Sequence, residues 1–461
     1  MTAVPSYWLE TSGDDLAPRP PLDGSETADI AILGAGYTGL WTAWYLARRD
    51  PSLRIIVVER EIAGFGASGR NGAWCAPDLN ISMTRLARLH GEDAARAMQQ
   101  ATYDAVDEVE RAATEAGINV GFHKGGSIIV SRGPAGLPSL EEAVAEYERF
   151  GFGDRYRLIE PDELATRIRI EGATRALVSD AAAVVHPGRL VRGLARAVER
   201  LGVRIVEGTE VTAVRPRDPG GLATFVTRRG EIRAPVVVLA GEAWLTGLPG
   251  LRRQLIPVYS LIVLTEPLGD DRWAEIGWAG REVVASTRLS VDYLSRTEDG
   301  RILFGGRGAP YRLGSPVRPD LDLHGPTHER LRRFVREWFP ALRDVHFTHA
   351  WGGPLGMPRD WHPTVAFDPA TGIATARGYV GHGVSTTNLA GRILAELVTG
   401  GDGPLTRLPI VNHRSPDWEI EPFRYLGVRY TQWALGRIDD ASARTGRPPT
   451  GRSLAERLAS H

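Results

Sequence analysis

Short, continuous apolar runs alternate with helical patterns at both ends of the chain. The first run, 30–33, leads through a glycine-rich turn and a helical stretch to a second run that closes on Glu59. Residues 373–400 repeat the order of strand, glycine turn and helix. Three further apolar runs lie between them, at 203–206, 211–214 and 236–239. Continuous apolar runs are typical of parallel strands covered on both faces. The pattern predicts an α/β fold of the doubly wound, nucleotide-binding kind.

The middle of the chain has a different texture. Between residues 250 and 345 apolar and polar positions alternate, as in 256–264 and 301–304, which favours an antiparallel sheet. Residues 83–117 have helical periodicity with a break expected at Gly91, a strand is expected at 126–130, and 140–150 are helical again. A second domain is therefore inserted twice into the first. We predict an N-terminal arm (1–28) that wraps the surface, a nucleotide-binding domain (29–85, 171–249 and 346–404), a substrate domain (86–170 and 250–345) and an aromatic, helical tail (405–461).

The first glycine turn has the pattern G-x-G-x-x-G. Its glycines allow a tight turn, a close approach of a pyrophosphate, and packing of the helix on the strand; they are Gly34, Gly36 and Gly39, with Tyr37 and Thr38 opening the helix. Free N–H groups at the helix start favour phosphate. Glu59 stands where a carboxylate can bind ribose hydroxyls, which argues against a 2′-phosphate and so against NADP. FAD and NAD both remain open at this point, as does a turn without a ligand.

Composition narrows the class of protein. The chain has 461 residues and a net charge of −1, so it offers no basic footprint for nucleic acid. Cys75 is the one cysteine, which excludes an intramolecular disulfide and a cysteine-based zinc site and suits the cytoplasm. Lys124 is the one lysine, so a mechanism that needs a lysine has a single candidate. No signal peptide and no apolar run of about 20 residues are recognisable. We therefore expect a cytoplasmic protein without membrane, nucleic-acid or metal partners.

Three further glycine-rich segments carry candidate chemistry. Residues 66–72, GASGRNG, let backbone and polar side chains approach something flat, although a surface loop would also look like this. Residues 239–244, LAGEAW, follow a buried strand. Residues 378–391, GYVGHGVSTTNLAG, place His382 between two glycines just before a helix. A helix N-terminus suits the N1–C2=O edge of a flavin, because reduction places negative charge there.

Together these residues resemble the superfamily of FAD-dependent D-amino acid oxidases (DAO), and most nearly its glycine oxidase and gamma-glutamylputrescine oxidase branch. The likeness rests on an ordered set of motifs: GAGYTGL (34–40), GASGRNG (66–72), IPVYS (256–260), DGRILFGG (299–306), WGG (351–353) and GYVGHGV (378–384). It implies an α/β (α+β overall) fold with a Rossmann-like FAD-binding domain and an inserted antiparallel-sheet substrate domain. It also implies hydride transfer from the carbon beside an amine to flavin N5, hydrolysis of the imine, and reoxidation by O2 to give H2O2.

The resemblance also assigns cofactor contacts. They are Gly34, Gly36, Tyr37, Thr38, Gly39, Glu59, Arg60, Gly66, Ala67, Ser68, Arg70, Asn71, Gly72, Val211, Ala240, Gly241, Gly353, Gly381, His382, Gly383 and Val384. Arg70 stands near the position where dehydrogenase relatives carry a flavin-linked histidine, and Cys75 does not match the flavin-linked cysteine of sarcosine oxidases. We therefore expect non-covalent FAD. Those oxidases also use a lysine near flavin N5, and the absence of lysine from 300–310 leaves the acceptor open.

The substrate site is less determined. The candidates are Tyr259, Arg288, Tyr293, Trp351 and His382. Arg288 could bind a carboxylate of the substrate or be an ordinary surface residue. Asp292 could bind a cationic amine. Trp351 could form an aromatic wall near the flavin or serve packing alone. His382 could stabilise charge on the flavin, orient the substrate or assist proton transfer. Three functions stay open: an amine or amino acid oxidase, a dehydrogenase with another acceptor, and a redox-inactive flavin-binding partner subunit.

Overall fold

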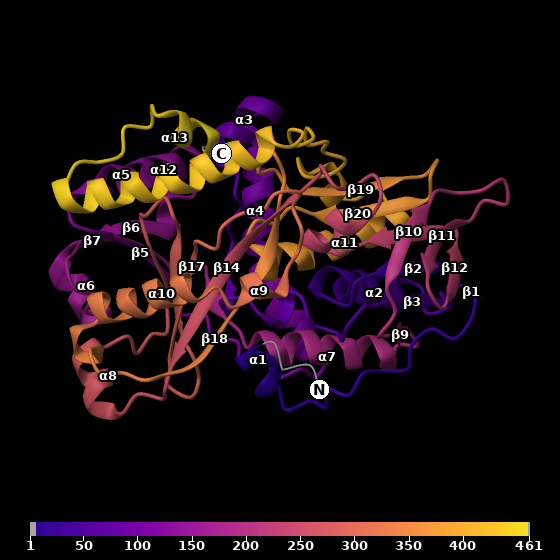
Figure 1. Ribbon diagram of the computed structural model, residues 1–461, viewed down its shortest axis with the longest axis horizontal. Helices are drawn as coiled ribbons and strands as arrows, with labels where there is room; N and C mark the ends of the chain where they lie inside the picture. Colours follow the sequence, from indigo (N-terminus) through magenta and orange to yellow (C-terminus); the bar gives the residue numbers. More distant parts are fainter. Residues whose placement is uncertain (1–5, 460–461) are drawn as a thin grey trace.

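A six-stranded sheet forms the core of one half of the molecule. The computed structural model describes residues 6–459, and Figure 1 shows this sheet and a larger one in opposite halves of the view. The strand order is β19-β20-β13-β2-β3-β9, with every pair parallel except the edge pair β19–β20. The strands are β2 (Ile30–Leu33), β3 (Ile55–Val58), β9 (Arg204–Val206), β13 (Val236–Leu239), β19 (Thr364–Asp368) and β20 (Ile373–Arg377). The helices associated with it are α2 (Tyr37–Arg49), α7 (Pro187–Arg200) and α11 (Gly383–Val398). The predicted α/β fold is confirmed.

An eight-stranded sheet forms the other half. Its order is β18-β14-β17-β16-β15-β5-β7-β6, antiparallel throughout except for the pair β15–β5. The strands are β5 (Ser127–Arg132), β6 (Tyr156–Ile159), β7 (Ala173–Ser179), β14 (Ile256–Thr265), β15 (Val283–Ser286), β16 (Asp292–Arg296), β17 (Ile302–Arg307) and β18 (Phe347–Met357). The parallel pair joins the two inserted stretches, which a short hairpin could not do. The accompanying helices are α5 (Leu137–Arg149), α6 (Pro161–Arg167), α8 (Asp270–Ile276), α9 (Pro319–Asp322) and α10 (Gly325–Trp338).

Two smaller sheets complete the strands. One has the order β1-β12-β11-β10, and the other pairs β4 with β8. Their bounds are β1 (Glu26–Thr27), β10 (Val211–Arg215), β11 (Ala223–Thr227), β12 (Gly230–Ala234), β4 (Trp74–Cys75) and β8 (Ala183–Val184). The predicted strand 211–214 therefore exists, but it pairs antiparallel with β11 outside the parallel sheet. Its placement in that sheet was wrong, because a hairpin partner immediately follows it.

The sheets divide the chain differently from the predicted boundaries. Strands β7 and β18 lie in the ranges predicted for the nucleotide-binding domain but pair within the eight-stranded sheet. Helices α3 (Met83–His90) and α4 (Glu92–Glu115) meet at Gly91, as predicted, whose φ is +92°. The buried face of α4 belongs to the core of the six-stranded sheet and contacts α11, although α4 lies in the range 86–170 predicted for the substrate domain. Backbone pairing and apolar burial decide these memberships, and neither is local in sequence.

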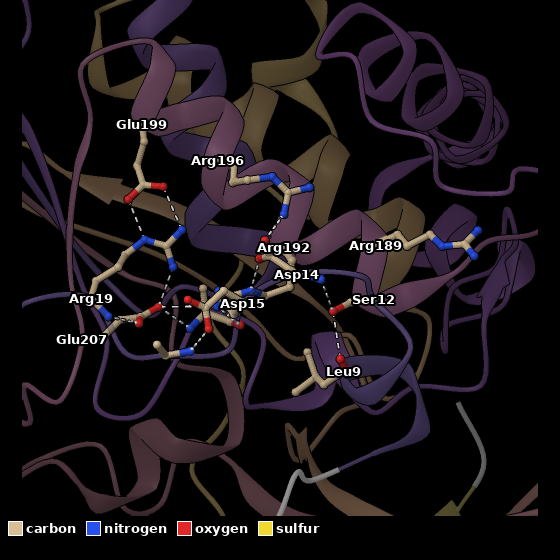
Figure 2. A network of polar contacts seen from close by, with 12 residues as sticks. Leu9, Ser12, Asp14, Asp15, Arg19, Arg189, Arg192, Arg196, Glu199 and Glu207 are labelled. Carbon is tan, nitrogen blue, oxygen red and sulfur yellow. Dashed lines mark hydrogen bonds and ion pairs between the residues drawn. The ribbon is translucent and has the colours of Figure 1, made fainter.

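The N-terminal arm is fixed by buried charges as well as by packing. Helix α1 (Tyr7–Glu10) buries three of its four side chains. Figure 2 shows the arm fastened to α7 and to Glu207, a fully buried carboxylate. Glu207 accepts hydrogen bonds from the backbone N–H of Arg19 and of Ala63, both at 2.7 Å, and pairs with Arg19 Nη1 at 2.9 Å. The arm is thus an integral part of the nucleotide-binding half.

The tail docks on the eight-stranded half through α12 (Phe423–Thr445), while α13 (Leu454–Ala459) packs against α12. The carboxylate of Asp439 accepts hydrogen bonds at 2.9 Å from the backbone N–H groups of Leu289 and Ser290. Short 3-10 helices lie at η1 (Ala67–Gly69), η2 (Pro134–Gly136), η3 (Gly153–Arg155), η4 (Glu242–Gly247), η5 (Pro340–Leu342) and η6 (Pro404–Arg407). No helix within residues 6–459 has the length and apolar character needed to cross a membrane.

Candidate functional site

A cavity of about 340 Å³ opens where the carboxyl ends of β2, β3 and β13 meet the start of α2 and α11. Ligands of doubly wound folds bind at this edge. The predicted cofactor residues that line it are Gly34, Gly36, Tyr37, Thr38, Glu59, Arg60, Gly66, Ala67, Ser68, Asn71, Val211, Ala240, Gly241, Gly381, Gly383 and Val384. The segments recognised from separate glycine motifs therefore converge on one cavity.

The glycine turn is shaped by close backbone contacts. Gly34 has φ +103°, and a Cβ there would lie 2.7 Å from the carbonyl oxygen of Ala240. A Cβ on Gly39 would lie 1.9 Å from the carbonyl oxygen of Gly34, so Gly39 serves helix packing and does not line the cavity. The backbone N–H of Tyr37 donates to Ser68 Oγ at 2.8 Å. A hydroxyl of the GASGRNG loop thus stands at the N-terminus of α2, where phosphate would bind.

Glu59 is held at the end of β3 by backbone donors. Its carboxylate accepts hydrogen bonds from the N–H groups of Ala35 and Glu61, both at 2.9 Å. Burial raises the pKa of Glu59. Each oxygen keeps a further lone pair for a hydroxyl donor. The Arg60 guanidinium lies 4.2 Å from the ring centroid of Trp244, which closes the same side of the cavity.

Arg70, Gly72 and Gly353 do not line the cavity. Arg70 Nη1 donates to Asp322 Oδ2 at 2.6 Å and to the carbonyl oxygen of Gly352 at 3.1 Å, so Arg70 binds the loop to the eight-stranded sheet. A Cβ on Gly353 would lie 3.3 Å from Arg70 Cδ, and one on Gly72 would lie 2.4 Å from the Tyr293 ring. These positions bring the loop and the sheet into close contact.

His382 lies immediately before α11, beside the cavity but outside its lining. Its imidazole Nδ1 is 3.8 Å from Asp78 Oδ2. Burial lowers the pKa of His382 and raises the pKa of Asp78, because both groups lose solvation. His382 is therefore neutral at pH 7.

Tyr259 lies on β14, and its side chain is on the face of the sheet opposite to Tyr293. Its hydroxyl lies at the 318 loop, 2.6 Å from the N–H of Arg318, and its ring belongs to the core beneath the sheet. Ser260 takes the opposite face, and its hydroxyl lies 2.8 Å from the hydroxyl of Tyr293. Burial raises the pKa of Tyr293 to about 12. Successive strand residues face opposite sides, so Ser260 faces Tyr293 while Tyr259 faces the core.

Arg288 and Asp292 are engaged within the protein. Arg288 Nε lies 3.7 Å from Asp439 Oδ2 of the tail helix, and its guanidinium lies 4.8 Å from the Phe334 ring. Asp292 accepts hydrogen bonds from the N–H and hydroxyl of Ser286. Trp351 is buried and donates its Nε1–H to the carbonyl oxygen of Arg70 at 2.9 Å. Its packing interpretation therefore fits the structure, and Arg288 is not placed to receive a carboxylate.

Two residues that the sequence reasoning missed stand at the site. Arg307 ends β17, and its Nη2 donates to the carbonyl oxygen of Val380 at 3.4 Å. Burial lowers the pKa of Arg307 to about 10, and no carboxylate among residues 6–459 pairs with it. Glu242 lines the cavity and accepts a hydrogen bond from the N–H of Gly378 at 3.0 Å. The sequence did contain a signal for each residue. Arg307 follows the motif DGRILFGG directly, and Glu242 lies within LAGEAW.

Known proteins share this architecture. Residues 29–397 match the DAO family, described as FAD dependent oxidoreductase. Gamma-glutamylputrescine oxidoreductase of Escherichia coli (strain K12) is 29% identical over 403 residues, covering 87% of this chain and 90% of that protein. A probable oxidoreductase OrdL of Rhizobium meliloti (strain 1021) is 30% identical over 398 residues, covering 86% and 89%. The structure of glycine oxidase from Geobacillus kaustophilus superposes with a TM-score of 0.68 at 20% identity, covering 84% of this chain and all of that chain, which shows a shared fold. The resemblance is confirmed: the chain belongs to the DAO family of FAD-dependent oxidoreductases.

Proposed function

We propose that this enzyme oxidises a C–N bond of a small amine or amino acid, that water then hydrolyses the imine, and that O2 reoxidises the cofactor to give H2O2. The observation that carries the proposal is the position of Arg307 and His382 beside the cavity, where Gly381 and Gly383 line its edge. The printed names of the relatives, an oxidoreductase of gamma-glutamylputrescine and a glycine oxidase, support the substrate class. A cytoplasmic location rests on the single cysteine, which is buried.

The residues of the cavity fit FAD. The Gly34–Gly36 turn and the amides that open α2 suit the pyrophosphate, Glu59 the ribose, Val211 the adenine, and 381–384 the pyrimidine edge of the flavin. FAD, when bound, supplies the hydride acceptor. Cys75 is fully buried, with its pKa raised by burial, which supports non-covalent binding.

The side chains beside the cavity supply recognition. Arg307 is a half-buried cation whose planar guanidinium suits an anionic group of the substrate. His382 is neutral and so suits a hydrogen bond with the reacting amine or acceptance of its proton. The Ser260–Tyr293 pair fixes the wall against which Gly72 packs. Together they orient an amine toward the cavity edge and keep water from it.

The spectrum of the purified protein, followed by substrate addition, tests this function. We expect a yellow protein that one amine or amino acid bleaches without oxygen and that makes peroxide in air. Acid precipitation should leave the yellow colour in the supernatant, and a yellow pellet would contradict non-covalent binding. A colourless protein that takes up no FAD would refute the proposal.

A dehydrogenase that uses another electron acceptor is the second candidate. It is favoured by the absence of lysine from 300–310 and by the position of Lys124, which forms an ion pair with Asp107 on the surface. Bleaching without peroxide, together with turnover of an artificial dye, would select the dehydrogenase over the oxidase.

Arg307→Leu tests the recognition of an anionic group, with Arg288→Leu as the matched control. Hydrogen bonds to charged groups contribute about 1.5–3 kcal/mol, so the KM of an amino acid should rise roughly 10- to 100-fold in Arg307→Leu. The KM of the corresponding amine without a carboxylate should change little. Equal losses for both substrates, or an equal effect of Arg288→Leu, would contradict the assignment.

A further inference from the structure

An aromatic ring and a carbonyl group hold the guanidinium of Arg307. Its Nη2 donates to the carbonyl oxygen of Val380 at 3.4 Å, and its Cζ lies 5.5 Å from the centroid of the Trp361 ring. A cation at this distance over an aromatic ring is attracted by the electrons of the ring face. Trp361 is only 8% exposed, so one side of the contact is shielded from water. Neither contact neutralises the positive charge, which remains available to an anionic group.

Trp361 is presented to Arg307 by a tight turn that follows β18. Its φ is +64°, which is unfavourable for a residue with a Cβ, and its N–H donates to the carbonyl oxygen of Pro358 at 3.2 Å. Gly378 packs against this turn, since a Cβ there would lie 3.1 Å from Pro358 Cγ. Backbone strain persists only where the surrounding structure maintains it. The conformation of residues 358–361 is therefore imposed by the neighbours of the turn.

Trp418 of the tail is one of those neighbours. Its Nε1–H donates to the carbonyl oxygen of Met357 at 2.8 Å, and the Arg359 guanidinium lies 5.2 Å from its ring centroid. The N–H of Trp418 donates to the carbonyl oxygen of Arg253 at 2.8 Å, and the carbonyl oxygen of Trp418 accepts from Arg253 Nε at 2.7 Å. Trp418 also shares a buried apolar cluster with residues on both sides of the Arg307 contact: Tyr311, Trp361 and Val380.

Gln432 of α12 holds the segment that leaves Arg307. Its amide oxygen accepts a hydrogen bond from the N–H of Tyr311 at 3.2 Å, and its amide nitrogen donates to the carbonyl oxygen of Ala309 at 3.4 Å. One side chain thus pairs with the backbone as a neighbouring strand would. The carbonyl oxygen of Arg307 itself accepts a hydrogen bond from Arg330 of α10. The backbone of 307–311 is therefore fixed from two sides, and the tail supplies one of them.

We propose that Trp361 is a positioning residue for Arg307. Trp418 and Gln432 hold the two segments that carry this pair, so the tail is part of the substrate site. The inference rests on the proposed function, in which Arg307 binds an anionic group of the substrate. Trp361 acts through Arg307: it sets the direction of the guanidinium fork, on which a bidentate bond to a carboxylate depends.

Trp361→Leu tests this role, with Trp361→Phe as the variant that keeps an aromatic face. The holoenzyme is assayed with amino acids and with the amines that lack their carboxylate: glycine with methylamine, and norleucine with pentylamine. In Trp361→Leu we expect the KM of the amino acid to rise roughly 3- to 30-fold, while kcat and the KM of the amine stay unchanged. Trp361→Phe should recover most of the loss. Equal changes for both substrates, or a Trp361→Phe no better than Trp361→Leu, would overturn the proposal.

Gln432→Leu tests the contribution of the tail, with Arg429→Gln as an exposed control on the same helix. Loss of the bonds to Ala309 and Tyr311 should raise the KM of the amino acid roughly 3- to 10-fold without changing that of the amine. Arg429→Gln should behave as the wild type. The thermal midpoint is measured for both variants. A lower midpoint in Gln432→Leu without a change in KM would mean that the tail contributes stability alone, and would overturn its part in the site.

A binding measurement separates this inference from the proposed function. The FAD-loaded enzyme is titrated with acetate, butyrate and hexanoate, and the flavin difference spectrum gives Kd without turnover. We expect the wild type to bind at least one of them, Trp361→Leu to bind it roughly 3- to 30-fold more weakly, and Arg307→Leu not to bind it. If no amine is oxidised yet binding depends on Trp361 in this way, the proposed function fails and the inference stands. Absent binding in the wild type, or equal binding in the wild type and Trp361→Leu, would overturn the inference.

Discussion

Glu242→Gln is the substitution whose effect follows most directly from the structure. Glu242 begins η4 with φ +47°, an unusual value for a residue with a side chain. Glu242 lines the cavity, its carboxylate accepts a hydrogen bond from the N–H of Gly378 at 3.0 Å, and a Cβ on Gly356 would lie 3.0 Å from its Cδ. It therefore joins the end of β18 to the segment that precedes His382. Glutamine keeps the shape and one acceptor oxygen but does not titrate.

The expected magnitude follows from the pKa. Burial raises the pKa of Glu242 from 4.5 to about 7. One pKa unit corresponds to about 1.4 kcal/mol, so this difference is worth about 3 kcal/mol. The folded state binds the proton more tightly than the unfolded state. The stabilisation is thus fully present below pH 4.5 and is lost as pH rises through 7. The free energy of unfolding of the wild type, relative to Glu242→Gln, should fall by about 3 kcal/mol between pH 4.5 and 8.

Urea unfolding of both proteins at several pH values, with excess FAD, measures this difference. Other titrating groups cancel because the two proteins share them. Glu210→Gln is the control, since Glu210 also lines the cavity but is exposed. A difference between wild type and Glu242→Gln that stays constant with pH would refute the reasoning, and so would an equal pH dependence in Glu210→Gln.

Three further substitutions test separate parts of the structure. Gly39→Ala places a Cβ 1.9 Å from the carbonyl oxygen of Gly34, so the protein should purify without flavin while circular dichroism shows a folded chain; a yellow variant would contradict this contact. Glu207→Ala leaves buried donors unpaired and should lower the free energy of unfolding by about 3–5 kcal/mol, measured in urea; a loss under 1 kcal/mol would show that the network is not stabilising. Tyr293→Phe removes the 2.8 Å contact with Ser260 and should cost about 1 kcal/mol of stability without loss of FAD, read from the thermal midpoint and the flavin absorbance.

The parallel sheet and its cofactor edge were predictable because their signals are local. Each of β2, β3 and β13 is a continuous apolar run, buried on both faces, and a turn or acid follows it directly. The turn geometry at Gly34 and Gly39 depends on contacts within the motif or with LAGEAW. Motif, strand and helix therefore predict the same cavity edge.

Sheet membership was harder to predict because it depends on distant partners. Strand β7 pairs with β5, about 45 residues earlier, and β18 pairs with β14, about 90 residues earlier. Both strands adjoin elements of the nucleotide-binding half in sequence, although they pair within the eight-stranded sheet. The covering helix α4 shows the same effect, since its apolar face fits either core and only the tertiary arrangement selects α11.

The substrate side was least predictable because its signals depend on facing and pairing. We expected alternation at 256–264, but nine of the ten positions of β14 are buried. The burial pattern therefore does not tell whether Tyr259 or Ser260 faces Tyr293. The same holds for the arginines. Arg288 is neutralised by Asp439, 151 positions later in the sequence, while Arg307 has no carboxylate partner within residues 6–459. Whether an arginine is available to bind substrate thus depends on whether a carboxylate of the protein already pairs with it. That property belongs to the folded molecule, and no local pattern around either arginine contains it.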